Sequence, residues 1–195
     1  MIKAVIFDFF GVIGISTYQL IAEKIDANSN DVRNKISDLH KALDNGFITQ
    51  EEFLHTYAEL ASLPYDDFLK IYHDASARFA VSDKLIDYIY ELKKRNYKIG
   101  LLTNVNEEAY KEFVQPVVAK DLFDEVMPSF ETKLVKPAEA AFTEMAKKLQ
   151  VSPSDCLMVD DLVANCQAAE ACGMQAIVFV DFYDFKQKIS QFMLG

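Results

Sequence analysis

The chain has 195 residues, of which 51% are hydrophobic and 26% are charged, and its formal net charge at pH 7 is −10. These proportions are typical of a globular protein with one sizeable core, with or without a small accessory domain. The negative net charge disfavours nucleic acid and anionic membranes as partners, because both are bound through clustered Lys and Arg. No apolar run reaches the roughly 18 residues that a membrane-spanning helix needs, so we expect neither kind of partner.

Five short apolar runs have the length and composition of buried strands. Amphipathic stretches with helical spacing lie between the later runs, such as residues 85–92 after a Ser82 N-cap. Strands that alternate with helices predict right-handed crossovers and an open parallel sheet, which is an α/β fold. The expected strands are KAVIFD (3–8), YKIGLLT (97–103), FDEVMP (123–128), DCLMVD (155–160) and QAIVFV (175–180).

A long segment after the first strand contains no convincing strand. Tyr18, Ile21 and Ile25 keep helical spacing, and Thr49 with Glu52 forms a capping-box pattern at the start of another helix. We therefore expect a helical insert of about four helices.

The insert predicts two parts in the chain. The core comprises residues 1–14 and 82–195, and the insert comprises residues 15–81. Gly11 and Gly14 are expected to permit the tight turn after the first strand, because glycine adopts backbone conformations that other residues avoid.

Polar residues follow the predicted strands at the edge of the sheet where their carboxyl ends meet. Ligands bind at this edge in open α/β sheets. Each residue taken alone has an ordinary explanation as a helix cap, a turn residue or a surface lysine. Their order on successive strands favours one shared site. The residues are Asp8 after the first strand, Thr103 and Asn104 after the second, Lys136 at the start of the third crossover, and Asp160 and Asp161 after the fourth.

Four short motifs occur in order along the chain: DFFGV (8–12), LLTN (101–104), VKPAEAAF (135–142) and VDDLVANCQAAEACGM (159–174). As an ordered set, they resemble the haloacid dehalogenase superfamily, in the branch with a small helical cap after the first strand. The stretch LDNGFITQEEF (43–53) is similar to a cap signature of a phosphatase-rich subgroup. The resemblance implies a Rossmann-like doubly wound parallel sheet with an inserted all-helical cap.

The resemblance also implies a phosphatase that acts on a small phosphorylated metabolite. Asp8 would attack phosphorus and form an aspartyl-phosphate, which divides one difficult displacement into two easier steps. Thr103 and Asn104 would bind the phosphate. Lys136 would neutralise both the phosphate and Asp8, so that two anions can approach each other.

A Mg²⁺ cofactor is implied by the same resemblance. Its ligands would be the carboxylates of Asp8, Asp160 and Asp161 and the backbone carbonyl of Phe10. Carboxylate oxygens suit this small, hard cation, which commonly shares its coordination sphere with phosphate. A protein of net charge −10 has to supply positive charge locally for phosphoryl transfer.

Phe10 departs from the family pattern. Most phosphatases of this family carry an aspartate at this position, which protonates the leaving group and later activates water. General acid–base help of this kind is worth about 10²–10⁴-fold. The first reading is a phosphatase in which another acid, a bound water or the substrate compensates. The second is a catalytically impaired protein that binds a phosphorylated ligand or a partner.

A third reading is a 2-haloacid dehalogenase, since those enzymes carry an aromatic tyrosine at this position. They work without metal, however, and neighbouring carboxylates such as Asp160 and Asp161 repel each other where no cation binds. This reading is therefore the least favoured of the three.

Few features of the sequence indicate the cellular compartment or the oligomeric state. Cys156, Cys166 and Cys172 have no metal-binding spacing, and their use as small core residues indicates a reducing cytoplasm. We expect a monomer or a homodimer. Ser16, Thr17 and Tyr18 are candidates for substrate contacts from the insert, although helix capping is the slightly favoured explanation for the linker hydroxyls.

Overall fold

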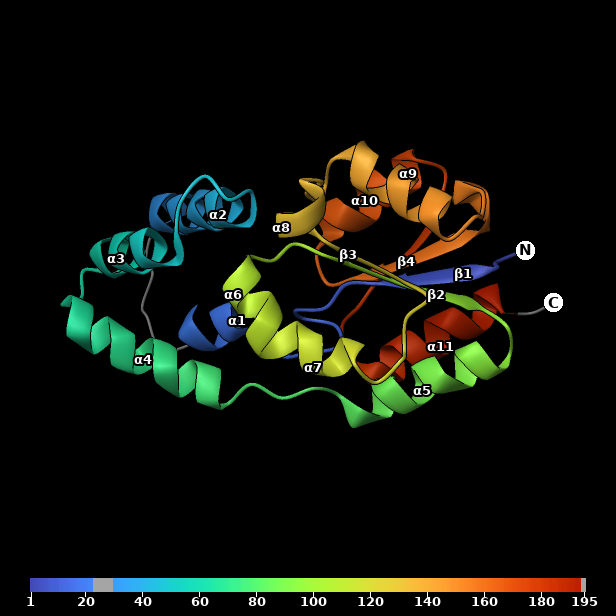
Figure 1. The fold of residues 1–195 in the computed structure, drawn as a ribbon, viewed down its shortest axis with the longest axis horizontal. Helices are drawn as coiled ribbons and strands as arrows, with labels where there is room; N and C mark the ends of the chain where they lie inside the picture. Colours follow the sequence, from blue (N-terminus) through green and yellow to red (C-terminus); the bar gives the residue numbers. More distant parts are fainter. Residues whose placement is uncertain (23–29, 194–195) are drawn as a thin grey trace.

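The computed structural model describes residues 1–22 and 30–193, and its centre is one parallel sheet (Figure 1). The five strands lie in the order β3-β2-β1-β4-β5. From β1 the chain adds two strands on one side and then two on the other, so the sheet is doubly wound, as predicted. The strands are β1 (Ala4–Phe7), β2 (Lys98–Thr103), β3 (Glu125–Pro128), β4 (Cys156–Asp160) and β5 (Gln175–Val178).

Helices cover both faces of the sheet (Figure 1). One face carries α5 (Asp83–Lys94), α11 (Phe182–Phe192) and a segment formed by α6 (Glu107–Ala109), the π-helical turn η1 (Tyr110–Val114) and α7 (Gln115–Val118). The other face carries α8 (Ser129–Thr132), α9 (Glu139–Lys148) and α10 (Val163–Ala171), and a short 3₁₀ turn, η2 (Pro153–Asp155), precedes β4.

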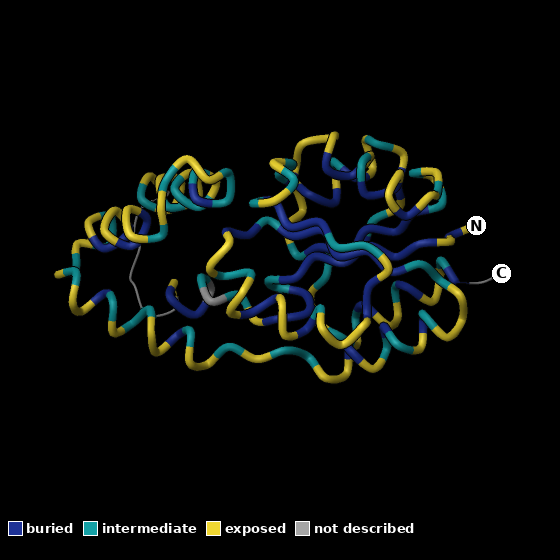
Figure 2. Tube along the Cα trace, in the orientation of Figure 1, coloured by how far each residue is buried: buried dark blue, intermediate teal, exposed yellow. Residues whose placement is uncertain are grey.

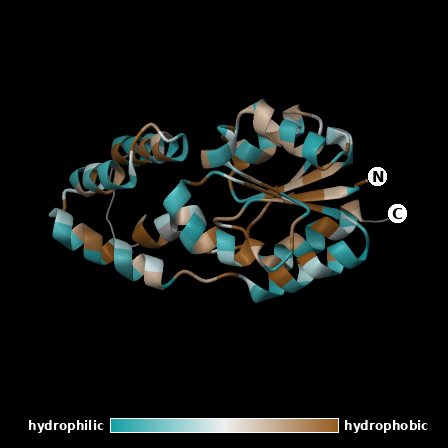
Figure 3. Ribbon diagram, viewed as in Figure 1, coloured by the Kyte–Doolittle hydropathy of each residue, from teal (hydrophilic) through white to brown (hydrophobic). Residues whose placement is uncertain are grey.

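The side chains of each strand alternate between the two faces. On β1, Val5 and Phe7 pack in the cluster that includes α5 and α11, whereas Ala4 and Ile6 pack in the cluster that includes α9. All four are fully buried, and the strands form the buried centre of Figure 2. The strands are hydrophobic and the helices around them are mixed (Figure 3), as expected for a parallel sheet covered on both faces.

The long segment between β1 and α5 is helical in the residues that the structure describes. Its helices are α1 (Thr17–Ala22), α2 (Asn30–Asp44), α3 (Gln50–Leu60) and α4 (Tyr65–Ala77). They pack around a separate hydrophobic cluster that includes Ile21, Phe53 and Phe68. Ile25, predicted on the same face as Ile21, lies outside the described residues.

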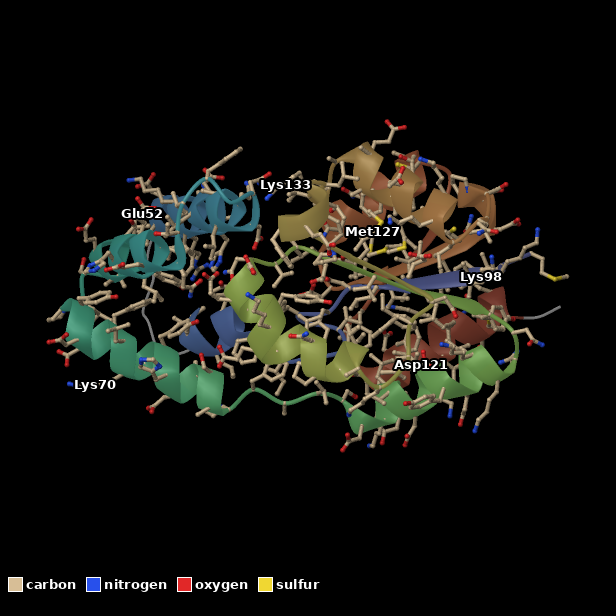
Figure 4. The ribbon with its side chains drawn as sticks, viewed as in Figure 1. Glu52, Lys70, Lys98, Asp121, Met127 and Lys133 are labelled. Atoms are coloured by element: carbon tan, nitrogen blue, oxygen red, sulfur yellow. The ribbon has the colours of Figure 1, made fainter. Side chains whose placement is uncertain are left out.

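The predicted capping box at the start of α3 is confirmed. The Glu52 N–H donates to the Thr49 hydroxyl at 3.2 Å, and the Thr49 N–H donates to the Glu52 carboxylate at 2.8 Å. Charged side chains such as Lys70 on α4 and Asp121 after α7 are exposed to solvent (Figure 4). Met127 on β3 is buried and packs with residues of α9.

Two chain segments connect α1–α4 to the sheet, and they lie side by side. The Ile15 N–H donates to the Ala80 carbonyl at 2.9 Å, and the Ser82 N–H donates to the Ile13 carbonyl at 2.8 Å. Between these bonds, Gly14 forms a bridge with Val81.

The two glycines after β1 serve different purposes. Gly11 has a φ of +88°, as the predicted tight turn requires. Gly14 lies in the same turn, where its N–H donates to the Phe9 carbonyl at 2.9 Å, but it does not adopt a left-handed conformation. A Cβ at Gly14 would lie 2.7 Å from the ring of Phe79, so this glycine is needed for the close approach of the two connecting segments.

Two further observations concern the environment of the chain. The three cysteines are free thiols, and Cys156 and Cys166 are buried. None of the helices in the described part of the chain is long and apolar enough to cross a membrane.

Candidate active site

The ammonium group of Lys136 lies at the carboxyl ends of β1 and β4, the neighbouring strands at which the strand order of the sheet changes direction. Its Nζ lies 2.8 Å from Oδ1 of Asp8 and 2.7 Å from Oδ2 of Asp160, and the lysine is only 4% exposed. Burial disfavours its charge, but Asp8 and Asp160 outweigh that effect, so the pKa of Lys136 is raised above its ordinary value. The structure therefore excludes a solvated surface lysine and places a buried ammonium group against both carboxylates.

Asn104 holds Lys136 in place. The Asn104 side-chain amide donates to the Lys136 carbonyl at 2.9 Å, and the Lys136 N–H donates to the Asn104 side-chain oxygen at 2.9 Å. Asn104 was predicted to bind substrate. It does line the cavity described below, but this reciprocal pair with the Lys136 backbone is a positioning role that the sequence analysis missed.

The Thr103 hydroxyl is fully buried at the end of β2 and has no hydrogen-bond partner among the described residues. Leaving a buried polar group without a partner costs about 1–3 kcal/mol. A buried hydroxyl of this kind is suited to an oxygen atom of a ligand.

The carboxylates of Asp8, Asp160 and Asp161 converge, with one oxygen of each within 4.8 Å of the others. Burial raises the pKa of Asp8 to about 7, while Lys136 opposes the rise and Asp160 adds to it. Burial and then Asp160 raise the pKa of Asp161 to about 6. Three acidic groups held this close favour a cation between them.

Asp160 is fixed by neighbours that the sequence analysis did not identify. Its Oδ1 accepts from the Leu162 N–H and from the side-chain amide of Asn165, each at 2.9 Å. Asn165 is buried on the first turn of α10. Its position five residues after Asp160 was the available signal, since the first turn of the following helix returns to the end of the strand.

Gly11 leaves space for Asp161. A Cβ at Gly11 would lie 2.3 Å from Oδ2 of Asp161, so no other residue fits without moving this carboxylate. The carbonyl oxygen of the neighbouring Phe10 accepts no hydrogen bond from the described residues. The three carboxylates and this carbonyl are an all-oxygen donor set that fits a small, hard cation such as Mg²⁺.

The Phe10 side chain belongs to an aromatic cluster. Its ring centroid lies 4.9 Å from that of Phe9 and 6.3 Å from those of Phe79 and Phe113. Phe79 belongs to the segment that returns from α4, and Phe113 belongs to η1. The ring thus joins three segments, and it has no group that could transfer a proton.

A cavity of about 420 Å³ lies between this rim of the sheet and the helices α1–α4. Asp8, Lys136 and Asp161 line it from the sheet. Ser16 and Tyr18, predicted as contacts, also line it, whereas the side chain of Thr17 lies outside the described residues. The helical wall adds residues that the sequence analysis did not single out, including Arg33, His40, Asp44, Tyr57 and Tyr72.

Two direct contacts join the helical segment to the sheet domain across this cavity. The side-chain amide of Asn106 donates to Oε1 of Gln50 at 2.9 Å. The Ser129 hydroxyl lies 3.1 Å from the carbonyl oxygen of Asp44, at the end of α2. Both pairs are far apart in sequence, and no local pattern indicates them.

Comparison with known proteins agrees with this architecture. Residues 2–173 match the family model of the haloacid dehalogenase-like hydrolases. The chain is 25% identical over 208 residues to D-ribitol-5-phosphate phosphatase of Bacteroides thetaiotaomicron, covering 97% of this chain and 98% of that one. It is 23% identical over 180 residues to the sesquiterpene phosphatase astK of Aspergillus oryzae, covering 92% and 90% of the two chains.

Solved structures share the fold. The HAD family enzyme bt-2542 of Bacteroides thetaiotaomicron, in its magnesium complex, has a TM-score of 0.72 at 20% identity and covers 96% of this chain and 98% of that one. A predicted HAD-like family hydrolase of Porphyromonas gingivalis has a TM-score of 0.69 at 24% identity, covering 100% and 99%. With the family model matching most of its length and the four motifs gathered at one rim of the sheet, this chain belongs to the haloacid dehalogenase-like hydrolases.

Proposed function

We propose that this hydrolase is a Mg²⁺-dependent phosphatase that acts on a small phosphorylated metabolite through an aspartyl-phosphate on Asp8. The observation that carries the proposal is the buried Lys136 ammonium, which contacts Asp8 and Asp160 at the point where three carboxylates converge. The D-ribitol-5-phosphate phosphatase and the HAD family enzyme bt-2542, which has been solved with magnesium and inorganic phosphate, support it.

The proposed chemistry assigns one task to each residue of the rim. Asp8 attacks phosphorus, while Lys136 neutralises charge on Asp8 and on the phosphoryl oxygens. The orphaned Thr103 hydroxyl donates to a phosphoryl oxygen, and Asn104 keeps Lys136 in position through its backbone. Water then attacks phosphorus and releases phosphate from Asp8.

Asp8, Asp160, Asp161 and the Phe10 carbonyl would hold the Mg²⁺. When bound, the cation would neutralise negative charge that develops on the phosphoryl group. Asn165 and the Leu162 N–H fix the carboxylate of Asp160 for this task, since each donates to its Oδ1.

The helices α1–α4 act as a cap over this site in the proposal, with residues 15–81 as the cap and residues 1–14 and 82–195 as the core. Their separate hydrophobic cluster and the paired connecting segments at Gly14 and Val81 support movement of the cap as one unit. Cap closure would exclude water from the phosphoryl group. A cavity of about 420 Å³ is within the usual size range for a small organic ligand.

The decisive experiment measures phosphate release from p-nitrophenyl phosphate with Mg²⁺ and with EDTA. Release that requires Mg²⁺, is abolished in Asp8→Asn, and leaves a phosphoryl group on Asp8 of the acid-quenched wild type would support the proposal. Asp121→Asn is the matched control, because that side chain is 97% exposed and should leave the rate unchanged. Retained activity in folded Asp8→Asn would refute covalent catalysis by Asp8.

Phe10 favours a second candidate function, a protein that binds a phosphorylated ligand without turnover. Its side chain contacts aromatic rings and supplies no acid or base. Binding of inorganic phosphate in calorimetry, together with no hydrolysis of aryl phosphates, would favour this candidate. Halide release from 2-chloropropionate without metal would instead indicate dehalogenase chemistry.

A further inference from the structure

We propose that Asp44, on the helical wall of the cavity, is the proton donor to the leaving group and takes the role that Phe10 cannot fill. This inference rests on the proposed phosphatase function. Asp44 lines the cavity opposite the phosphate site, and its carboxylate makes no hydrogen bond or ion pair in the described part of the chain. The proposed function assigns Asp8 and Asp161 to the nucleophile and metal roles, so among the described residues that line the cavity Asp44 is the acidic side chain with no task.

The position of Asp44 is fixed by the sheet domain and not by α2 alone. The Ser129 hydroxyl lies 3.1 Å from the carbonyl oxygens of both Asp44 and Val105, and it accepts from the Val105 N–H at 2.9 Å. Val105 follows Asn104, which holds the backbone of Lys136. A short chain of contacts therefore places the end of α2 beside the phosphate-binding residues.

The electrostatic setting of Asp44 suits proton transfer. Burial raises its pKa to about 7, and the charge of Lys136 opposes the rise. A donor is most effective when its pKa is near the working pH, because it is then partly protonated and still acidic enough to give up the proton.

Three other titratable groups on the helical wall are poorer candidates. Burial lowers the pKa of His40 to about 4, so the imidazole is neutral and holds no readily donated proton at pH 7. Burial raises the pKa of Tyr57 to about 12, and burial together with Asp44 raises the pKa of Tyr18 well above its usual value.

The two chemical steps balance with Asp44 in this role. Asp8 forms a bond to phosphorus as the bond between phosphorus and the leaving oxygen breaks, and that oxygen takes the proton of the Asp44 carboxylic acid. The resulting Asp44 carboxylate then takes a proton from the attacking water. The water oxygen bonds to phosphorus, the bond to Asp8 breaks, and phosphate leaves with Asp44 protonated again.

The test compares two leaving groups in the wild type and in Asp44→Asn. p-Nitrophenolate leaves readily without a proton, whereas phenol, with a pKa of about 10 like that of Tyr, needs one. We expect kcat/KM for phenyl phosphate to fall by about 10²-fold or more, as for the loss of a general acid. For p-nitrophenyl phosphate the loss should be at least tenfold smaller, and the variant should accumulate phosphorylated Asp8 after acid quenching because deprotonation of water is also slowed.

The substitution leaves the docking contact intact, because Ser129 contacts the backbone of Asp44 and not its side chain. Asp38→Asn on the same helix is the control, since Asp38 is 73% exposed and pairs with Lys41 at the surface. Equal losses on both substrates, or no loss, would overturn the role of Asp44 while leaving the proposed function standing. A wild type that hydrolyses neither substrate with Mg²⁺ would overturn both.

Discussion

The two walls of the cavity differ in how their polar groups are held. On the sheet side, Lys136, Asp8 and Asp160 are tied into one buried network with Asn104 and Asn165. The helical side presents several aromatic rings, including those of Tyr18, Tyr57 and Tyr72, and the carboxylate of Asp44 makes no hydrogen bond among the described residues. The polar groups of the sheet side are thus held rigidly at the proposed metal and phosphate sites, while the helical side carries the acid that we propose changes its protonation state.

Removal of Lys136 should produce the largest effect on the sheet wall. Lys136→Met leaves two buried carboxylates without their counter-charge, which costs about 3–5 kcal/mol when one partner of a buried pair is lost. We expect this loss in the free energy of unfolding, measured by urea denaturation at pH 8 without divalent cations. The same variant should have no measurable phosphatase activity.

Lys111→Met is the matched control for this prediction. Lys111 pairs with Glu107 on the exposed surface of one helix, and such pairs contribute about 0–1 kcal/mol. If Lys136→Met were no less stable than Lys111→Met, the network would not hold the sheet wall together as we describe.

Gly11→Ala should weaken the metal site with a smaller effect on folding. The new methyl group would lie 2.3 Å from the Asp161 carboxylate, so Asp161 has to move away from Asp8 and Asp160. We expect the Mg²⁺ concentration for half-maximal activity to rise by about 10–100-fold, as for disruption of groups that orient metal ligands. The thermal stabilisation that Mg²⁺ gives to the free protein should decrease in parallel.

Gly46→Ala is the matched control, because it adds the backbone strain of a left-handed alanine without the clash with Asp161 that Gly11→Ala creates. Gly46 also has a positive φ, +71°, but a Cβ there meets nothing within 4 Å. Both variants pay for a left-handed alanine, roughly 1–2 kcal/mol, and Gly11→Ala alone should lose Mg²⁺ affinity. An equal Mg²⁺ dependence in the two variants would argue against Asp161 as a metal ligand.

The sequence predicted the sheet wall much better than the helical wall, and the reason is physical. In a parallel sheet the residues that follow successive strands meet at one edge, so the apolar runs alone bring Asp8, Thr103 and Asp160 together. Asp44 lies at the same cavity where α2 contacts Ser129, and this contact joins residues 85 positions apart. No spacing rule applies to such a contact.

The roles of Phe10 and Asn104 also depend on contacts between residues that are far apart in sequence. The sequence indicated that Phe10 lacks an acid, but only the structure shows its ring against Phe79 and Phe113. Asn104 was expected at the phosphate because it follows a strand. Its bonds to Lys136, 32 residues away, depend on how the crossover returns to the sheet.

Asp44→Asn should change stability less than Lys136→Met does, and the change should depend on pH. We expect the variant to gain stability although it loses activity. Burial raises the pKa of Asp44 in the folded state from its ordinary value of 3.8 to about 7. A carboxyl with a raised pKa binds more protons in the folded state than in the unfolded state between these values, so its contribution to stability declines as the pH rises from about 4 to 7. The amide of Asp44→Asn does not titrate, so the variant does not lose stability in this way as the pH rises.

We therefore expect Asp44→Asn to match the wild type near pH 4 and to exceed its free energy of unfolding by about 1–3 kcal/mol at pH 8. Urea denaturation at both pH values measures the difference, and Asp38→Asn should show no such pH dependence. A side chain retained for packing would instead make the variant less stable at both values. Stability gained together with activity lost on phenyl phosphate would mark Asp44 as a group kept in a costly environment for its chemistry, because substitutions that relieve an unfavourable site commonly impair the function that the site serves.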